Sequence, residues 1–342
     1  MNRLSAVAAF IACIVFLSFS FFLQAQDIYA ARKDSVKVPR QPYLRYFTKD
    51  RYDRQVTFYI TETNSTAKLP LVVYVQGSGS SSNFAKINDK ITPRNGHIYV
   101  YEAMQEKARL LIIEKPGVHY LDNPGQEESD KNIEFNQQHS LERWAEAVEA
   151  AIKATIREGL TDSSRILIIG HSEGGLVACK VANDLGGLVT HVANLAGGGD
   201  SQLYDILALA RKGNFFMHIS PEPNQRVQYV LDEWKKILDD PFNTQKFFFG
   251  FSYFRWSTFM KTSCLAQLEN CLAKIFIGQG FKDENLDPLS ADQLYAHLLS
   301  KNRNVTYDRL ENADHSFNDK DKPGFNGWKA EMEKIVAWFL NE

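Results

Sequence analysis

The 342-residue sequence has little cysteine and almost no net charge, and both shortages exclude classes of protein. Four cysteines are too few for a small disulfide-stapled scaffold, and no cluster of cysteine and histidine suggests a metal or a cofactor. A formal net charge of −2, with basic residues spread thinly, provides no basic patch of the kind that binds nucleic acid. No internal repeat or low-complexity linker is visible. An apolar content of 44% instead predicts a large core in one domain that carries an insertion.

The first 25 residues differ from the rest of the chain. Arg3 supplies a short positive region, and residues 5–23 form an uncharged, mostly apolar stretch that ends near Ala25. This pattern predicts a secretory signal peptide over residues 1–25, and therefore an exported protein, periplasmic or secreted. An uncleaved membrane anchor through residues 5–23 is the alternative, because this stretch nearly reaches the roughly 20 residues that span a bilayer.

Three cysteines remain after such a cleavage. Cys179 lies in a helical pattern, where a small buried apolar side chain is the simplest interpretation. Cys264 and Cys271 are candidates for a disulfide in an oxidising compartment. Seven residues of straight helix rise about 10.5 Å, which exceeds the reach of a disulfide. The bridge therefore requires a bend between the two residues, and the sequence leaves it open.

Apolar runs alternate with helical patterns along most of the chain. Residues 55–60 alternate in the manner of a half-buried strand. Nearly continuous apolar runs predict strands buried on both faces at 69–75, 110–113, 166–169, 189–195 and 273–277. Apolar spacings of three and four predict helices over 141–156 and 176–185. This order indicates an α/β fold with a mostly parallel central sheet flanked by helices.

The alternation stops between residues 201 and 272. An amphipathic helical pattern covers residues 226–238. Nine aromatic residues then follow within nineteen positions: Phe242, Phe247, Phe248, Phe249, Phe251, Tyr253, Phe254, Trp256 and Phe259. We expect these rings to dock an inserted helical cap onto the main domain, to line an apolar substrate pocket, or both. The predicted core is residues 26–200 and 273–342, with residues 201–272 as the cap insertion.

One short motif indicates chemistry: Gly170-His171-Ser172-Glu173-Gly174 stands between a predicted strand and a predicted helix. A serine between two glycines at such a turn is typical of a nucleophile. The turn is so tight that side chains at Gly170 and Gly174 would clash with their neighbours, and Ser172 takes a strained, exposed position. The pattern also arises by chance in about one chain of this length in ten, so the context must support it.

A serine hydroxyl becomes a good nucleophile when a base removes its proton. His315 follows the last predicted strand, residues 305–310, in a loop from which it can lean over a strand end. His171 belongs to the turn itself, and His297 falls on a helical pattern. Four further histidines have no acid at a suggestive spacing: His119, His139, His191 and His218. We therefore expect His315 to be the base.

The base needs a carboxylate that fixes its tautomer and stabilises the imidazolium. Asp283 lies in the loop after the predicted strand at 273–277, 32 residues before His315, and is the expected acid. Asp287 and Asp200 are the alternatives. All three also fit the role of solvated loop residues, and Asp287 precedes a proline as the first residue of a helix often does.

The charge that develops on a substrate carbonyl oxygen is stabilised by two backbone N–H donors, which form the oxyanion hole. The N–H of Glu173 directly follows the expected nucleophile at the start of the helix. The second donor is expected from the loop Val75-Gln76-Gly77-Ser78-Gly79-Ser80, with the N–H of Ser78 as the best candidate. A loop of this composition also fits a flexible connection alone.

These parts together resemble the α/β-hydrolase superfamily. The chain order Ser172, Asp283, His315, the turn at the serine and the glycine loop are similar to that family's pattern over about residues 55–342. The residues after the serine resemble the prolyl-oligopeptidase, dienelactone-hydrolase and acyl-thioesterase branches. Glu114-Lys115-Pro116-Gly117 resembles the family's loop after its fourth strand. Gln76 departs from the pattern, because many members carry histidine before the oxyanion glycine.

The resemblance implies the fold, the triad and acyl hydrolysis. We therefore expect an exported serine hydrolase in which Ser172 attacks an ester-like carbonyl, His315 shuttles the proton and Asp283 orients His315. No cofactor, metal or nucleic acid is expected, and a membrane partner only if residues 5–23 stay uncleaved. The ring-rich insertion favours a small acyl substrate with an apolar or aromatic part. The alternatives are a serine peptidase of the prolyl-oligopeptidase type, an acyltransferase and a non-catalytic binding protein on the same fold.

Overall fold

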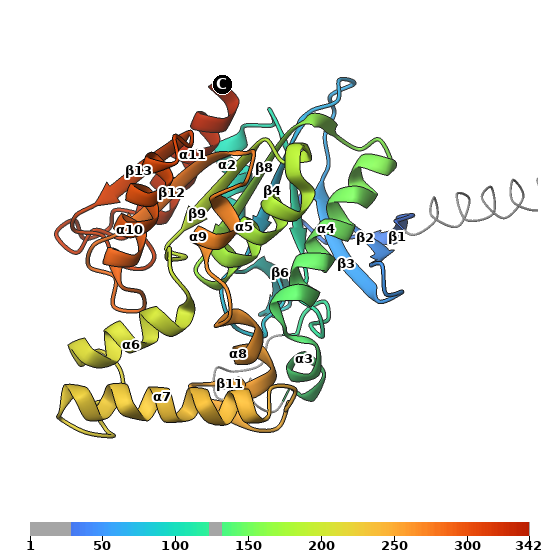
Figure 1. The fold of residues 1–342 in the computed structure, drawn as a ribbon. Helices are drawn as coiled ribbons and strands as arrows, with labels where there is room; N and C mark the ends of the chain where they lie inside the picture. Colours follow the sequence, from blue (N-terminus) through green and yellow to red (C-terminus); the bar gives the residue numbers. More distant parts are fainter. Residues whose placement is uncertain (1–28, 123–131, 342) are drawn as a thin grey trace, which may run out of the picture.

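The computed structural model of the protein describes residues 29–122 and 132–341, and Figure 1 shows its fold. The predicted signal segment, residues 1–25, lies outside the described residues. Within them, a mixed sheet of nine strands passes through the middle of the molecule between helices. The predicted fold, an α/β-hydrolase fold with a mostly parallel sheet, is confirmed.

The strands lie side by side in the order β1-β2-β3-β7-β4-β8-β9-β12-β13. The first three pair antiparallel with one another, and β3 pairs antiparallel with β7; from β7 to β13 all neighbours are parallel. Their bounds are β1 Arg32–Lys37, β2 Tyr43–Lys49, β3 Gln55–Thr61, β4 Pro70–Val75, β7 Arg109–Ile113, β8 Asp162–His171, β9 His191–Leu195, β12 Lys274–Gly280 and β13 Val305–Leu310.

The central strand β4 shows why the parallel strands are continuously apolar. Leu71 and Val73 pack into one hydrophobic core, whereas Val72 and Tyr74 pack into the other, because successive side chains point to opposite faces of a sheet. Helices α4, α5, α9 and α10 cover the first core, and α2 and α11 cover the second. Their bounds are α2 His97–Met104, α4 Leu141–Arg157, α5 Glu173–Leu185, α9 Cys264–Leu268, α10 Pro288–Ser300 and α11 Gly327–Asn341.

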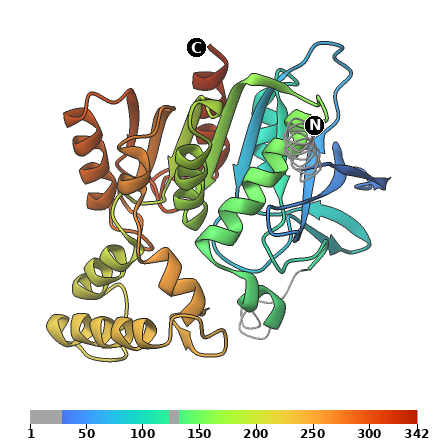
Figure 2. The ribbon, with the colours of Figure 1, turned by 45° about the vertical axis from the view of Figure 1, so that its right-hand side comes forward.

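Between β9 and α9 the chain leaves these layers. Figures 1 and 2 both show α6 and α7 beyond one end of the sheet. The insertion consists of α6 Gln202–Lys212, α7 Pro223–Asp239, the hairpin of β10 Phe247–Phe248 and β11 Phe251–Ser252, and α8 Tyr253–Phe259. Smaller elements elsewhere are β5 Phe84–Ile87, β6 Lys90–Pro93, α3 Ile133–Gln138 and the 3₁₀ turn η2 Gly186–Leu188.

The aromatic residues of the insertion divide between three environments. Phe248, Tyr253 and Trp256 form a hydrophobic cluster with side chains of α6 and α7, so these rings hold the insertion together. Phe259 packs instead into the core beneath the sheet, which is the docking role expected from the sequence. Phe242, at 81% exposure, stays on the surface.

The disulfide considered between Cys264 and Cys271 is not formed. Cys179, Cys264 and Cys271 are all free and buried. Cys264 is the first residue of α9, and its thiol faces the carbonyl oxygen of Gly197 at 3.5 Å. Both candidate residues pack into the core with Cys179, so their side chains serve as small apolar groups.

Within residues 29–122 and 132–341, no helix is both long and apolar enough to cross a membrane.

Candidate active site

Ser172 stands at the turn between β8 and α5. Its backbone has φ 54° and ψ −124°, a strained conformation for a residue with a side chain. The turn is held by its own backbone: the N–H of Ser172 donates to Leu195 at 2.8 Å, and the N–H of Gly175 donates to the carbonyl of Ser172 at 2.9 Å. The sharp turn predicted around this serine is therefore present.

The two glycines flanking this turn are sterically required. A Cβ atom at Gly170 would lie 2.1 Å from the carbonyl oxygen of Gly174. One at Gly174 would lie 2.3 Å from the carbonyl oxygen of Val75 in β4. Strand β8, helix α5 and strand β4 approach one another so closely that only glycine fits at these positions.

His315 and Asp283 come from loops after two neighbouring parallel strands, β13 and β12. Nδ1 of His315 lies 2.8 Å from Oδ2 of Asp283. The carboxylate also accepts hydrogen bonds from Gln279 Nε2 at 3.1 Å, from the N–H of Asn285 at 2.8 Å and from the N–H of Leu286 at 3.1 Å. The Asp283 side chain is fully buried and held from several sides, so it fixes the orientation of the imidazole ring.

Gly280, at the end of β12, allows the two loops to meet. A Cβ atom there would lie 2.4 Å from the carbonyl oxygens of both Ala313 and Asp314. The loop that carries His315 therefore passes directly over the end of β12, as parallel neighbouring strands predict.

The two alternative acids have other roles. Asp287 is the N-cap of α10 and pairs with Lys212 at 2.8 Å. Asp200 accepts a hydrogen bond from the N–H of Ser201 at 2.7 Å. No hydrogen bond between either carboxylate and His315 occurs in the described part of the chain, so the geometry favours Asp283.

His171 supports the loop of His315. Its Nε2 lies 3.0 Å from the backbone carbonyl oxygen of His315, to which only a protonated Nε2 can donate. The ring lies against those of His315 and Trp328, at centroid distances of 4.9 and 4.7 Å. Burial lowers the pKa of His171 to about 3, so this imidazole is neutral near pH 7.

The loop expected to provide an oxyanion donor lies beside the serine. A Cβ atom at Gly77 would lie 3.3 Å from Cβ of Ser172. Among the described residues, the N–H of Ser78 makes no backbone hydrogen bond. The N–H of Glu173 is the first of α5 and has no partner within the helix. Both candidate donors are thus placed next to Ser172.

Gln76, where many α/β-hydrolases carry histidine, is buried and holds this loop from within. Its side-chain oxygen accepts a hydrogen bond from the Asn95 amide, and its Nε2 lies 3.4 Å from the carbonyl oxygen of Ser81. The departure from the family pattern therefore leaves the loop backbone supported.

The side chain of Glu173 is the centre of a buried charge network. Nε of Arg255, in α8, donates to Oε2 at 2.9 Å, and Nε2 of His139 donates to Oε1 at 3.1 Å. Nζ of Lys115, in the loop after β7, lies 3.6 Å from Oε1. One carboxylate thus joins the nucleophile turn, the insertion and two loops of the core.

The charges in this network follow from burial and pairing. Burial raises the pKa of Glu173, but Arg255, His139 and Lys115 together hold it well below its usual range. Burial lowers the pKa of His139 to about 4 and that of Lys115 to about 8. Near pH 7 the network therefore holds one carboxylate, one guanidinium, an ammonium and a neutral imidazole.

Two cavities open at Ser172. One, of about 380 Å³, is walled by side chains that include Tyr74, His171 and Trp328. The other, of about 360 Å³, is bounded by residues of the insertion: Phe215, Phe249, Phe251, Arg255 and Trp256. Ser78, Ser172 and His315 line both, so the serine stands where the two cavities meet.

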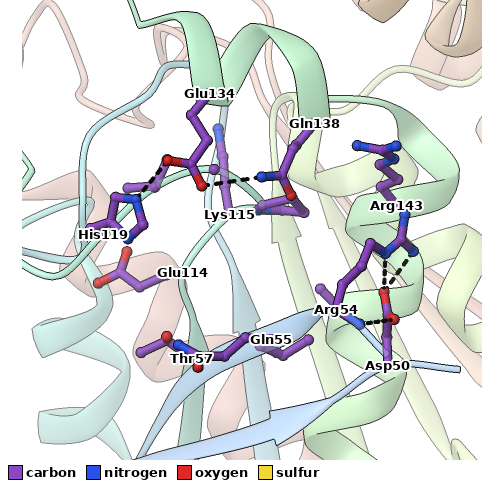
Figure 3. A pocket seen from close by; sticks show the side chains of 15 residues that line it. Asp50, Arg54, Gln55, Thr57, Glu114, Lys115, His119, Glu134, Gln138 and Arg143 are labelled. Carbon is purple, nitrogen blue, oxygen red and sulfur yellow. Dashed lines mark hydrogen bonds and ion pairs between the residues drawn. The ribbon is translucent and has the colours of Figure 1, made fainter. Parts of the chain in front are cut away.

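A further cavity, of about 240 Å³, does not include Ser172 or His315 among its lining residues. Figure 3 shows its charged walls, with His119 paired to Glu134 on one side and Arg54 paired to Asp50 on the other. Lys115 also borders it, but no dashed line joins Lys115 to the residues drawn.

The partners of Glu173 escaped the sequence analysis. His139 lies 34 residues before Glu173 in the chain, and Arg255 lies 82 residues after Glu173. The sequence did contain one indication of this network, which is Glu173 itself. A carboxylate at the start of a buried helix requires cationic partners. Which cations supply them depends on tertiary packing.

Solved structures of similar fold include two peptidases and a smaller protein. The chain aligns with a puromycin-hydrolyzing peptidase of Mycobacterium tuberculosis over 92% of its own length and 40% of that chain, with 14% identity and a TM-score of 0.53. It aligns with the Pyrococcus horikoshii acylaminoacyl peptidase over 88% of its own length and 42% of that chain, with 13% identity and a TM-score of 0.56. It aligns with Est1E from Butyrivibrio proteoclasticus over 88% of its own length and 100% of that chain, with 11% identity and a TM-score of 0.54. The chain thus spans about two fifths of each peptidase, and at these identities the likeness shows the fold alone.

No curated protein sequence matches the chain. A model of the alpha/beta hydrolase family matches residues 72–325, well over half of its 342 residues. This stretch includes the turn at Ser172, both loops that carry Asp283 and His315, and the whole insertion. The protein belongs to the alpha/beta hydrolase family.

Proposed function

We propose that the protein is a serine hydrolase that cleaves a carboxylic ester or a related acyl bond through Ser172, His315 and Asp283. The observation that carries the proposal is the 2.8 Å contact between His315 Nδ1 and Asp283 Oδ2. His315 lines both cavities at Ser172, and the loop of Asp283 borders the one beneath the insertion. Membership of a hydrolase family supports it.

In the proposed mechanism each residue has one task. Asp283 accepts a hydrogen bond from Nδ1–H of His315, which keeps the proton on Nδ1. The free Nε2 lone pair then takes the proton of the Ser172 hydroxyl as the serine oxygen attacks the carbonyl carbon. The N–H groups of Glu173 and Ser78 stabilise the oxyanion of the tetrahedral intermediate. His315 then returns the proton to the leaving alcohol. Water, activated by the same imidazole, attacks the acyl-enzyme and releases the acid.

The cavity beneath the insertion suits an apolar or aromatic acyl group. Phe215, Phe249, Phe251 and Trp256 provide rings on its wall, close to Ser172. Est1E, one of the proteins of similar fold, has been solved with ferulic acid, an aromatic acid, at 13% identity to this chain. We propose that the acyl part of the substrate occupies this cavity.

A serine peptidase is the second candidate, because several proteins of similar fold are peptidases. Purified protein is assayed with p-nitrophenyl esters of acetic, butyric and ferulic acids and with aminoacyl p-nitroanilides. Turnover of the esters, with the aromatic ester preferred in kcat/KM, supports the proposal. Turnover of the anilides alone overturns the esterase assignment in favour of the peptidase.

We also propose that the chain is exported through the apolar stretch at residues 5–23. Expression of the full chain followed by fractionation and intact-mass measurement tests this. A mature form beginning at Gln26 outside the cytoplasm agrees with cleavage after Ala25. A full-length product in the membrane fraction indicates the anchor instead, and full-length product in the cytoplasm contradicts export.

A further inference from the structure

We infer that Lys115 is a positioning residue of this active site, which holds the Ser78 N–H in the direction of the substrate oxyanion. The inference rests on the proposed function and assigns to the charge network a part in the reaction.

The hydrogen bonds of Lys115 reach the backbone on both sides of Ser78. Its Nζ donates to the carbonyl oxygen of Gly77 at 2.6 Å and to that of Gly79 at 2.7 Å. The carbonyl of Gly77 and the N–H of Ser78 belong to one planar peptide group, in which they point in opposite directions. When Lys115 holds the oxygen on one side, the Ser78 N–H must point to the other.

The sequence of this loop makes such a support necessary. Gly77 and Gly79 have no side chains that pack, and Gly79 has φ +106°, a conformation that favours glycine. Without an external partner, the peptide group between Gly77 and Ser78 is free to rotate. A donor aimed before the reaction begins is what makes an oxyanion hole effective.

Burial of Lys115 turns this support into a rigid one. The side chain has no exposed surface, so its ammonium group has lost its water and depends on protein partners. Beyond the two carbonyl oxygens, those partners are the carboxylate of Glu173 at 3.6 Å and the ring of Trp144, whose centroid lies 4.4 Å from Nζ. If the loop turned its carbonyls away, the ammonium would remain buried with unsatisfied protons, which is strongly unfavourable.

Lys115 also connects the two expected donors. It holds the peptide that contains the Ser78 N–H, and it pairs with the side chain of Glu173, whose own N–H is the second donor. One cation therefore contacts both the loop that carries the first expected donor and the residue that carries the second. Loss of this cation acts on the charge that develops in the transition state, so it lowers kcat more than it raises KM.

The test compares Lys115→Met with wild-type protein and with Lys180→Met as matched control. Methionine has nearly the length of lysine but donates no hydrogen bond. Lys180 lies in α5, the helix that follows Ser172, and pairs with Asp184 at 2.8 Å away from the oxyanion loop. For each protein, kcat and KM for a p-nitrophenyl ester, the rate constant of labelling by a fluorophosphonate, and the thermal unfolding curve are measured.

We expect Lys115→Met to lower kcat by about 10- to 100-fold with KM within about threefold of wild type, and to lower the labelling rate to a similar degree. Lys180→Met should stay within about twofold in every rate. A folded Lys115→Met protein with kcat within threefold of wild type, or with a raised KM as its main defect, overturns the inference.

If Lys115→Met does not fold, Lys115→Gln is measured in the same way, since its amide still donates but is too short to reach both carbonyl oxygens. A fall in kcat of at least fivefold supports the inference, and an unchanged kcat overturns it. Wild-type protein that neither turns over esters nor reacts with the fluorophosphonate contradicts the proposed function, and the inference then falls with it. If the inference alone fails, the wild-type protein is active and the folded Lys115 variant has nearly the same kcat.

Discussion

Nε of Arg255 lies 2.9 Å from Oε2 of Glu173, and this contact joins the helical insertion to the residue directly after Ser172, the proposed nucleophile. The guanidinium of Arg255 also lies over the rings of Trp256 and Phe259, at 3.8 and 4.3 Å from their centroids. The ion pair between Arg255 and Glu173 therefore holds in place the aromatic wall of the cavity beneath the insertion. In the proposed function, substrate binding under the insertion and the geometry of the oxyanion hole would therefore depend on the same ion pair.

Removal of the charge of Glu173 should destabilise the protein strongly. Glu173→Gln leaves the guanidinium of Arg255 and the ammonium of Lys115 buried without their anion, and breaking such a buried pair costs about 3–5 kcal/mol. Urea unfolding measures the loss. Glu134→Gln is the control, because its pair with His119 is half exposed and is worth at most about 1 kcal/mol. Equal unfolding free energies for the two variants would show that the network does not stabilise the fold.

Asp283→Asn should lower kcat by about a thousandfold to ten-thousandfold. The amide no longer selects the tautomer of His315 that has a free Nε2 lone pair, and it no longer stabilises the imidazolium. Steady-state kinetics with a p-nitrophenyl ester measures the effect. Asp287→Asn and Asp200→Asn serve as controls and should keep kcat within about threefold. If Asp287→Asn lost activity and Asp283→Asn did not, the acid would be misassigned.

The nucleophile turn should tolerate no side chain at its first glycine. Gly170→Ala places a methyl group 2.1 Å from the carbonyl oxygen of Gly174, so strand β8 and helix α5 must move apart. We expect a loss of more than 3 kcal/mol in unfolding free energy, or insoluble protein. Gly187→Ala is the control, because its added methyl would meet only a leucine methyl at 3.9 Å, and its stability should change by less than about 1 kcal/mol. Similar solubility and stability of the two variants would contradict this account of the turn.

Three buried histidines should each make an unfavourable contribution to the stability of the protein in mild acid. Burial lowers the pKa of His97 and His139 to about 4 and that of His171 to about 3, from an ordinary value of 6.5. Below pH 6.5 these histidines are protonated in the unfolded chain but not in the folded protein, so their contribution to the unfolding free energy falls as pH decreases toward 4. The buried carboxyls of Glu114 and Glu331 act in the opposite direction, because burial raises their pKa values to about 7 and about 8. Each histidine contributes up to about 1.4 kcal/mol per pH unit.

Urea unfolding at pH 7.5, 6 and 5 measures this dependence, and His97→Gln should reduce its slope. The difference between the two proteins isolates one ring, because the buried carboxyls of Glu114 and Glu331 affect both proteins equally. Equal slopes for wild type and His97→Gln would contradict the burial of His97 in its neutral form.

The sequence was sufficient for features that depend on local pattern and on the geometry of parallel strands. Continuous apolar runs predict β4, β7, β8, β9 and β12, because strands buried on both faces need apolar side chains throughout. The proximity of Asp283 and His315 follows from loops at the same edge of neighbouring strands. The state of Cys264 and Cys271 could not be settled, since it depends on how α9 packs against the core.

The charge network shows where sequence reasoning stops. Lys115, His139 and Arg255 lie 58, 34 and 82 residues from Glu173, and none of them stands in a recognisable spacing to it. Their meeting depends on the docking of the insertion and of two loops. A buried carboxylate beside the nucleophile predicts that cationic partners exist, but the fold decides which residues they are.

Covalent labelling of Ser172 tests the central claim most directly. Folded protein is treated with a fluorophosphonate, digested with trypsin, and the peptide of residues 166–180 is examined by mass spectrometry. We predict stoichiometric phosphonylation at Ser172, and for Ser172→Ala no labelling and a loss of at least about a thousandfold in ester turnover. An unmodified Ser172 in folded protein, while a known serine hydrolase in the same solution reacts, would contradict the account.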